Sequence, residues 1–356
     1  MLKWKPDWPA AKANLTRWWN GQGLAVCLLV GRKQARDGLA PPPPQPDIRL
    51  QWIDVDYRLR KDEYQLACTD FLLEAFPFLD TKMGPGSLGT FLGATPHFAE
   101  TTVWYEPCIA DPEGFEPIRF DPRGEWYLRH MALIEAAVAR ADGRYLVGIP
   151  DLIEGLDTLA ALRGSQMLLA DLLDRPAWVH RRLEEINEAY FAAFDPMHER
   201  VKDADGGNAF AAFHIWGPGK TAKVQCDFCC MISPAMFREF VSPYLSAQCD
   251  RLDYSLYHLD GPGAVRHLDA LLEIRSLNAI QWVPGAGHPT GGNACWYDLY
   301  RRIRAGGKAV QAFNVKADEV RPLIEAVGPS GLFISTRCHG PAEADRLIDD
   351  LRQYRT

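Results

Sequence analysis

A histidine and an aspartate stand two residues apart near the end of an apolar stretch. His258 and Asp260 follow residues 253–256, which are typical of a buried strand, and the turn Gly261-Pro262-Gly263 comes next. Because side chains alternate along a strand, the imidazole and the carboxylate are expected on the same face. Such a pair can bind a metal ion, exchange protons with a substrate, or fix a turn through a hydrogen bond. The spacing alone leaves all three roles open.

Cysteine and carboxylate side chains end other predicted strands. Cys338 follows the last apolar run, and with His258 and Asp260 it offers one sulfur, one nitrogen and one oxygen ligand. Three protein ligands, with a fourth position left for water or substrate, are the form of a catalytic zinc site. Glu106 and Asp151 could instead act as a carboxylate pair of the kind that glycosidases use.

Aromatic and further polar residues at strand ends are candidates for contacts with a substrate. These are Trp104, Trp216, Gln281, Trp282, His214 and His339. The three tryptophans can form an aromatic wall for a sugar, an aryl methyl ether or a quaternary amine. They can equally pack in a core, and the histidine at position 214 can equally be structural.

Apolar runs that alternate with helical patterns would position these residues. The strand candidates are residues 24–30, 101–105, 144–150, 209–216, 253–256, 279–283, 308–313 and 332–336. Strands that alternate with helices predict parallel βαβ units, and about eight of them favour an α/β fold of the (β/α)8 TIM-barrel type. No GxGxxG motif follows the first strand, which argues against a dinucleotide-binding sheet. In a barrel, the carboxyl ends of all strands meet at one mouth.

Helical patterns fill much of the remaining chain. Residues 1–23 predict an N-terminal helical extension, and residues 24–356 predict a single barrel catalytic domain. Helices are also predicted over 62–78 and 125–141. A further helix is predicted to begin at Ser233-Pro234, with the serine as its N-cap and the proline in its first turn.

The composition narrows the classes of function. The 356 residues carry a net charge of −7 and no basic run, so the chain offers nothing for a nucleic-acid backbone. No segment approaches the ~20 apolar residues of a membrane span. Nine cysteines at irregular spacing do not form a disulfide framework. We therefore expect a cytoplasmic protein that acts on a small molecule, with a homodimer as one option for its oligomeric state.

Three stretches give the C-terminal two-thirds of the chain a family resemblance. Residues 232–244, Ile-Ser-Pro-Ala-Met-Phe-Arg-Glu-Phe-Val-Ser-Pro-Tyr, resemble a helix motif of the uroporphyrinogen decarboxylase superfamily. Residues 258–261, His-Leu-Asp-Gly, stand where the methyltransferases of that superfamily have His-x-Cys-Gly. Residues 335–340, Ser-Thr-Arg-Cys-His-Gly, fall where those enzymes place a zinc-binding cysteine after the last strand. That branch moves methyl groups between corrinoid proteins and thiols such as coenzyme M.

The resemblance implies a metal site with one departure. It assigns Zn²⁺ to His258, Asp260 and Cys338, with a carboxylate in place of the usual second thiolate, which makes the site harder and the metal a stronger Lewis acid. It also places Asp227 where the superfamily often carries an aspartate near its pocket. The arginine-rich signature of the decarboxylase branch is absent, and the corresponding loop is Met83-Gly84-Pro85-Gly86.

These observations predict a metal-dependent methyltransferase that moves a methyl group between a small molecule and a thiol or a corrinoid protein. The alternative is a metal-independent lyase, similar to a decarboxylase, or a hydrolase. It would use Asp227, Asp151 and His258 as acid/base groups. A third hypothesis is a non-catalytic module that binds a ligand or a corrinoid protein.

Overall fold

The computed structural model describes residues 2–114 and 117–355. Its larger sheet has seven strands in the order β2-β1-β13-β12-β11-β10-β9. Only β2 runs antiparallel to its neighbour, and the other pairs in this sheet are parallel. The strands are β1 (Leu24–Gly31), β2 (Thr69–Leu73), β9 (Thr221–Gln225), β10 (Tyr254–Asp260), β11 (Ala279–Val283), β12 (Ala309–Val315) and β13 (Leu332–Cys338).

A smaller sheet and a hairpin complete the strands. The four-stranded sheet has the order β3-β6-β7-β8, in which the first three strands are parallel and β8 turns back antiparallel to β7. Its strands are β3 (Phe78–Leu79), β6 (Leu146–Ile149), β7 (Asn208–Phe210) and β8 (Ile215–Gly217). The hairpin pairs β4 (Thr95–Phe98) with β5 (Val103–Glu106).

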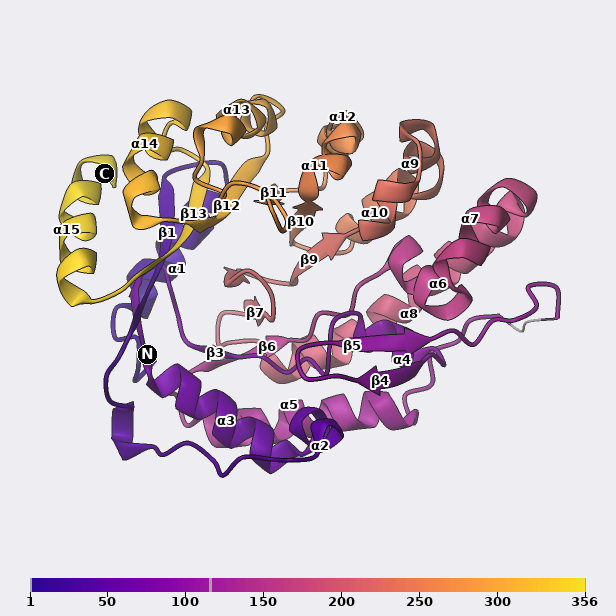
Figure 1. Ribbon diagram of the computed structural model, residues 1–356, viewed down its shortest axis with the longest axis horizontal. Coiled ribbons are helices and arrows are strands. Elements are labelled where there is room, and N and C mark those ends of the chain that lie inside the picture. The colour runs from indigo at the N-terminus through magenta and orange to yellow at the C-terminus, as the bar shows by residue number, and fades with distance from the viewer. Residues whose placement is uncertain (1, 115–116, 356) are drawn as a thin grey trace.

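Helices cover the outside of both sheets (Figure 1). The helices are α1 (Trp8–Trp19), α2 (Ile48–Ile53), α3 (Val55–Ala67), α4 (Ser87–Phe91), α5 (Glu125–Ala141), α6 (Gly155–Arg163), α7 (Ser165–Asp174), α8 (Pro176–Val201), α9 (Pro234–Phe240), α10 (Ser242–Cys249), α11 (Gly261–Ala264), α12 (Leu268–Leu272), α13 (Tyr297–Ala305), α14 (Ala317–Val327) and α15 (Pro341–Leu351). In the described part of the chain, none of these helices combines the length and the apolar character needed to cross a membrane.

Side-chain hydrogen bonds join the two sheets where β7 meets β9. The Asn208 side-chain amide accepts from Thr221 N at 2.9 Å and donates to Thr221 O at 2.9 Å. These two bonds connect β7 to β9 in place of main-chain hydrogen bonds between the strands. Within the larger sheet, Glu74 directly follows β2 and extends the β1–β2 pairing, since Glu74 N donates to Val26 O and Val26 N donates to the Glu74 carboxylate at 2.7 Å.

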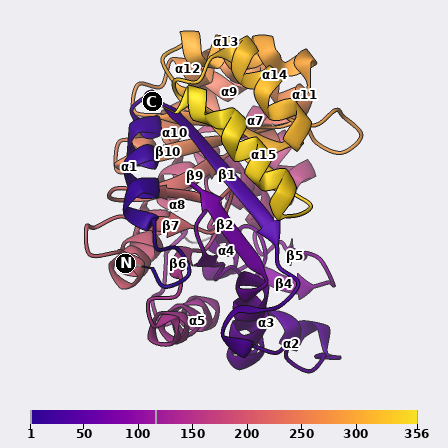
Figure 2. The same ribbon diagram turned by 90° about the vertical axis from the view of Figure 1, so that its left-hand side faces the viewer.

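Helix α1 contacts both sheets through tryptophans on its buried face. Trp18 Nε1 donates to Val310 O in β12, and Trp19 Nε1 donates to Trp216 O in β8 at 2.8 Å. The helix lies beside β1 (Figure 2). The helix predicted near the N-terminus is therefore present, and it contacts both sheets.

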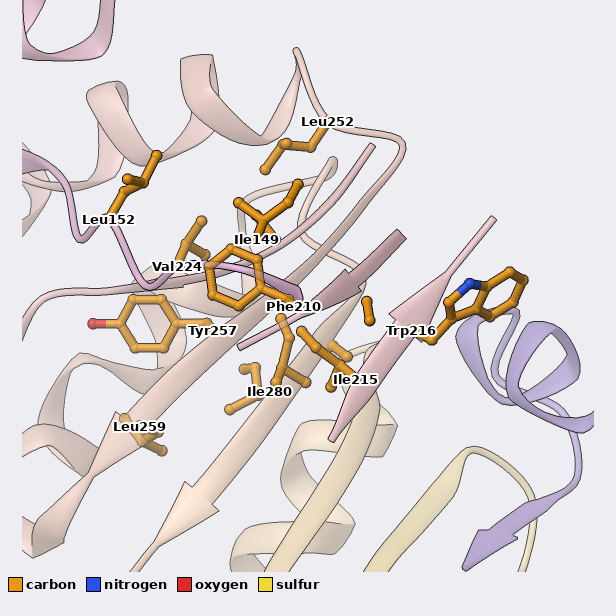
Figure 3. Close-up of a cluster of buried hydrophobic side chains, with 14 of the residues drawn as sticks. Ile149, Leu152, Phe210, Ile215, Trp216, Val224, Leu252, Tyr257, Leu259 and Ile280 are labelled. Atoms are coloured by element: carbon orange, nitrogen blue, oxygen red, sulfur yellow. The ribbon is translucent and has the colours of Figure 1, made fainter. Parts of the chain in front are cut away.

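The apolar core lies between strands of both sheets. Figure 3 shows Ile149 and Phe210 of the smaller sheet beside Val224, Tyr257 and Ile280 of the larger one. All five side chains are less than about a twentieth exposed. Burial of this kind is the dominant stabilising contribution in a domain of this size.

Several predicted elements are confirmed and several are wrong. The helix over 125–141 matches α5, and the Ser233 side chain caps α9 by accepting from Met236 N. The predicted strand 101–105 is instead part of a surface hairpin, because β5 pairs with β4 alone. The predicted helix 62–78 stops at the end of α3, and β2 and β3 follow.

The apolar run at 209–216 is also different from its prediction. It forms β7 and β8 rather than one strand, because Phe213 and His214 have left-handed backbones with φ of 56° and 53° and reverse the chain. The next strand, β9, was not predicted, although it carries part of the candidate site. The architecture is an α/β fold with a large parallel sheet, as the alternation of strands and helices predicts.

Candidate functional site

The register of three neighbouring strands brings polar side chains to one face of the sheet. His258 of β10 is paired with Gln225 of β9 and with Gln281 of β11. Paired residues of parallel strands point to the same face, and Asp260, two residues further along, shares it. The predicted common face of His258 and Asp260 is thus confirmed.

Asp227 joins this pair to form a group of potential metal ligands. It begins the 3₁₀ turn Asp227–Met231 directly after β9. One ligand atom each from Asp227, His258 and Asp260 lies within 4.8 Å of the others. Two carboxylate oxygens and one imidazole nitrogen are a ligand set suited to a divalent cation.

Gln281 determines which nitrogen of His258 is free. The distance from His258 Nδ1 to Gln281 Oε1 is 2.5 Å. Since an amide oxygen only accepts, Nδ1 carries the proton, and Nε2 keeps its lone pair for a ligand. Burial, followed by the positive charge of Lys223, lowers the pKa of His258. The neutral imidazole that a metal requires is therefore the favoured form.

Asp157 at the start of α6 holds Asp227 in place. The Asp157 carboxylate accepts from the main-chain nitrogens of Asp227 and Phe228, both at 2.8 Å. Gln225 Nε2 donates to Asp157 and to Asp227, both at 3.0 Å. Desolvation, followed by the charge of Asp157, raises the pKa of Asp227 to about 7. Carboxylates that repel one another in this way are stabilised by a bound cation.

A buried ion pair lies beneath the group. Lys223 is 1% exposed, and its Nζ lies 2.7 Å from Asp151 Oδ1 and also donates to Gln225 Oε1. Asp151 was predicted as an acid/base residue, and the structure pairs it with this lysine. Lys223 was not predicted, although a lysine in the apolar run 221–226 is the signal that could have revealed it.

Glu154 is a further carboxylate near the end of β6, and the sequence offers it as a candidate together with Asp151. Its Oε1 accepts from Gln225 N at 2.5 Å. Burial raises the pKa of Glu154 to about 8, so this carboxyl group holds a proton at neutral pH. Asp151, Glu154 and Asp157 stand three residues apart after β6, and this spacing of acidic residues is the available sequence signal.

Cys338 lies on the other face of its strand. Gln281 pairs with Gln311 of β12, and Gln311 pairs with Phe333 of β13, so Phe333 points to the same face as the site. Cys338 lies five residues after Phe333. Because side chains alternate along a strand, Cys338 points to the opposite face. Burial, followed by the charge of Glu343 in α15, raises the pKa of the Cys338 thiol to about 11. The structure does not place Cys338 with Asp227, His258 and Asp260, so the sulfur ligand expected from sequence lies outside this group.

The predicted wall of three tryptophans does not form. Trp216 is 2% exposed and packs edge-on against Trp8 of α1, with ring centroids 5.4 Å apart. Trp282 is fully buried against Trp296. Trp104 alone of the three is open to solvent, at 56% exposure.

The remaining predicted residues are placed as follows. Glu106 is exposed on the β4–β5 hairpin, where its carboxylate lies 3.1 Å from His97 Nε2. His214 packs edge-on against Phe78, and burial, followed by the charge of Arg337, lowers its pKa to about 4. His339 is exposed, and its main-chain nitrogen donates to Glu343.

A groove of about 510 Å³ opens beside Asp227. Asp157 and Asp227 line one part of it, and Trp104, Tyr105, Phe228 and Met231 line much of the rest. The volume is in the range of small-molecule sites. The hairpin that carries Trp104 thus forms one side of the groove, close to α6 (Figure 1).

Comparisons with known proteins show a likeness in fold. No protein-family model matches the sequence, and no curated protein matches it significantly. Among solved structures, a methyltransferase from Methanosarcina mazei superposes with a TM-score of 0.61 over 96% of this chain and 98% of that one, at 12% identity. The chain has the fold of this methyltransferase. At this level of identity the likeness concerns the fold.

Proposed function

We propose that this protein is a metal-dependent methyltransferase of the uroporphyrinogen decarboxylase superfamily, acting on a small molecule together with a thiol or a corrinoid protein. The observation that carries the proposal is the group of Asp227, His258 and Asp260, whose ligand atoms lie within 4.8 Å of one another. The likeness of the whole chain to a methyltransferase fold supports it.

A closed (β/α)8 barrel is part of the proposal. The hydrogen bonds of Asn208 with Thr221 join the two sheets between β7 and β9. Closure would bring the ends of all the parallel strands to one mouth, where active sites of barrel enzymes lie. His258 and Asp260 stand at such a strand end.

The residues of the site fit a divalent cation such as Zn²⁺. Asp227, His258 and Asp260 would hold it, and when bound it would lower the pKa of a thiol or water acceptor. The protein's own residues prepare the site. Gln281 keeps His258 Nε2 unprotonated, and Asp157 fixes the backbone of Asp227.

Metal analysis of purified variants tests the proposal and its ligand set. We expect about one divalent ion per chain in the wild type and in Cys338→Ala, and loss of the ion in His258→Ala and Asp227→Ala. The cysteine variant is the matched control, since Cys338 faces α15 rather than the site. Loss of metal in Cys338→Ala with retention in Asp227→Ala would support the ligand set implied by the sequence resemblance instead.

A metal-independent lyase or hydrolase is the second candidate. Two carboxyl groups with pKa values raised to about 7 (Asp227) and about 8 (Glu154) favour it, because such groups exchange protons at neutral pH. It predicts turnover that a chelator leaves unchanged and that Asp227→Asn abolishes. Methyl transfer that stops on metal removal and returns on addition of Zn²⁺ would exclude it.

A further inference from the structure

The groove beside Asp227 has a distinctive chemical composition. Its acidic side chains are Asp157 and Asp227, and its open side carries the aromatic ring of Trp104 and the thioether of Met231. No lysine, arginine or histidine is among the described residues that line it. The groove therefore offers negative charge and polarisable surface, and it offers no cationic group to an anionic ligand.

Two large apolar side chains that line the groove are exposed to solvent. Trp104 is 56% exposed and Met231 is 49% exposed. The Trp104 ring is braced from one side by His97, with ring centroids 4.9 Å apart, and His97 is held in turn by Glu106. A large aromatic ring that is braced on a hairpin and open to solvent at a groove is a typical ligand contact.

Tyr105 and Asp157, two of the polar residues that line the groove, are already engaged within the protein. Tyr105 donates its hydroxyl proton to Pro85 O. The Asp157 carboxylate accepts from two main-chain nitrogens and from Gln225. Few directed hydrogen bonds remain for a sugar, whereas the attraction of carboxylates and aromatic rings for a cation needs no directed donor.

We propose that this groove binds a small organic cation, a quaternary or methylated ammonium compound, and that this cation is the methyl donor of the reaction. The role of the cation as methyl donor rests on the proposed methyl transfer. Its binding is inferred from the residues that line the groove. In transfer to a thiol, the C–N bond breaks and its electron pair stays on nitrogen. The thiolate sulfur supplies the pair for the new S–C bond, so a neutral amine and a thioether result.

A pair of ligands that match in shape and differ in charge tests the proposal. Choline and 3,3-dimethylbutan-1-ol have nearly the same shape, and only choline carries a positive charge. We expect calorimetry or ligand-observed NMR to show choline binding at least about tenfold more tightly than the alcohol. Trp104→Ala should weaken choline binding by about tenfold, and Trp104→Phe should retain part of it.

A control variant and control ligands distinguish cation binding in the groove from binding elsewhere on the protein. Leu173→Ala, at a position on α7 that is 74% exposed and outside the lining, should leave binding unchanged. Equal binding of both ligands, tighter binding of the anion 3,3-dimethylbutyrate, or no binding of choline would overturn the proposal. Choline binding without methyl transfer would overturn the proposed function and with it the donor role of the cation, while the cation-binding groove would stand. Methyl transfer from a neutral aryl ether without choline binding would overturn this inference alone.

Discussion

Gln281 accepts a hydrogen bond from His258 across the β10–β11 pair, and the two atoms lie 2.5 Å apart. This contact links the interior of the parallel sheet to the candidate metal site. The Gln281 side chain is fully buried, and its Nε2 has no hydrogen-bond partner, so the bond to His258 is the defined role of this amide. It makes Gln281 a positioning residue for the imidazole.

Replacement of Gln281 should therefore weaken metal binding. We expect Gln281→Leu to lower metal affinity by about 10- to 100-fold, because His258 loses the acceptor that sets its tautomer and ring orientation. Competition with a chromogenic chelator measures the affinity. Gln311→Leu is the matched control, since Gln311 occupies the paired position on β12 but donates to Phe213 O. Equal affinities in both variants would contradict the role of Gln281.

Loss of the buried lysine should destabilise the fold. We expect Lys223→Met to lower the free energy of unfolding by about 3–5 kcal/mol, because Asp151 is left charged without its partner. Urea denaturation followed by circular dichroism measures the change. The double variant Lys223→Met/Asp151→Leu should recover part of the loss. A double variant less stable than the single one would show that the ion pair is not the cause.

The stability of the metal-free protein should fall as the pH rises toward 8. The pKa of Glu154 is raised from 4.5 to about 8 in the folded state, so between these values the folded protein keeps a proton that the unfolded chain has released. The free energy of unfolding then decreases with a slope of at most about 1.4 kcal/mol per pH unit for this group. Chemical denaturation across pH 5 to 9 measures it, and Glu154→Gln should flatten the profile. An unchanged profile in that variant would remove Glu154 as the origin.

The seam between β7 and β9 should depend on a single side chain. Asn208→Ala removes two hydrogen bonds to the main chain of Thr221 and leaves that buried N–H and C=O without this partner, so we expect a loss of about 2–4 kcal/mol in unfolding free energy. Asn208→Asp keeps the acceptor for Thr221 N and should lose less. Hydrogen exchange of the β9 amides should rise in the alanine variant. Unchanged exchange would mean that the seam is held by other contacts.

Local patterns were enough to predict the α/β fold class and the common face of His258 and Asp260. The alternation of apolar runs with helical patterns predicts an α/β fold with parallel strands, and the structure has one. The two-residue spacing of His258 and Asp260 predicts a shared face, since the alternation of side chains is a property of any strand. The cap at Ser233 and the helix over 125–141 were also predictable, because interactions between residues close in sequence determine them.

Tertiary structure decided which side chains meet the histidine. Cys338 and Asp227 are both candidates from sequence, but the register through β11 and β12 turns Cys338 toward α15, while the turn after β9 brings Asp227 to His258. The run at 101–105 has the pattern of a strand. Its pairing with β4 in a surface hairpin, which the sequence does not reveal, places its residues along the groove. Faces and partners arise from contacts between residues far apart in the chain, which no local pattern encodes.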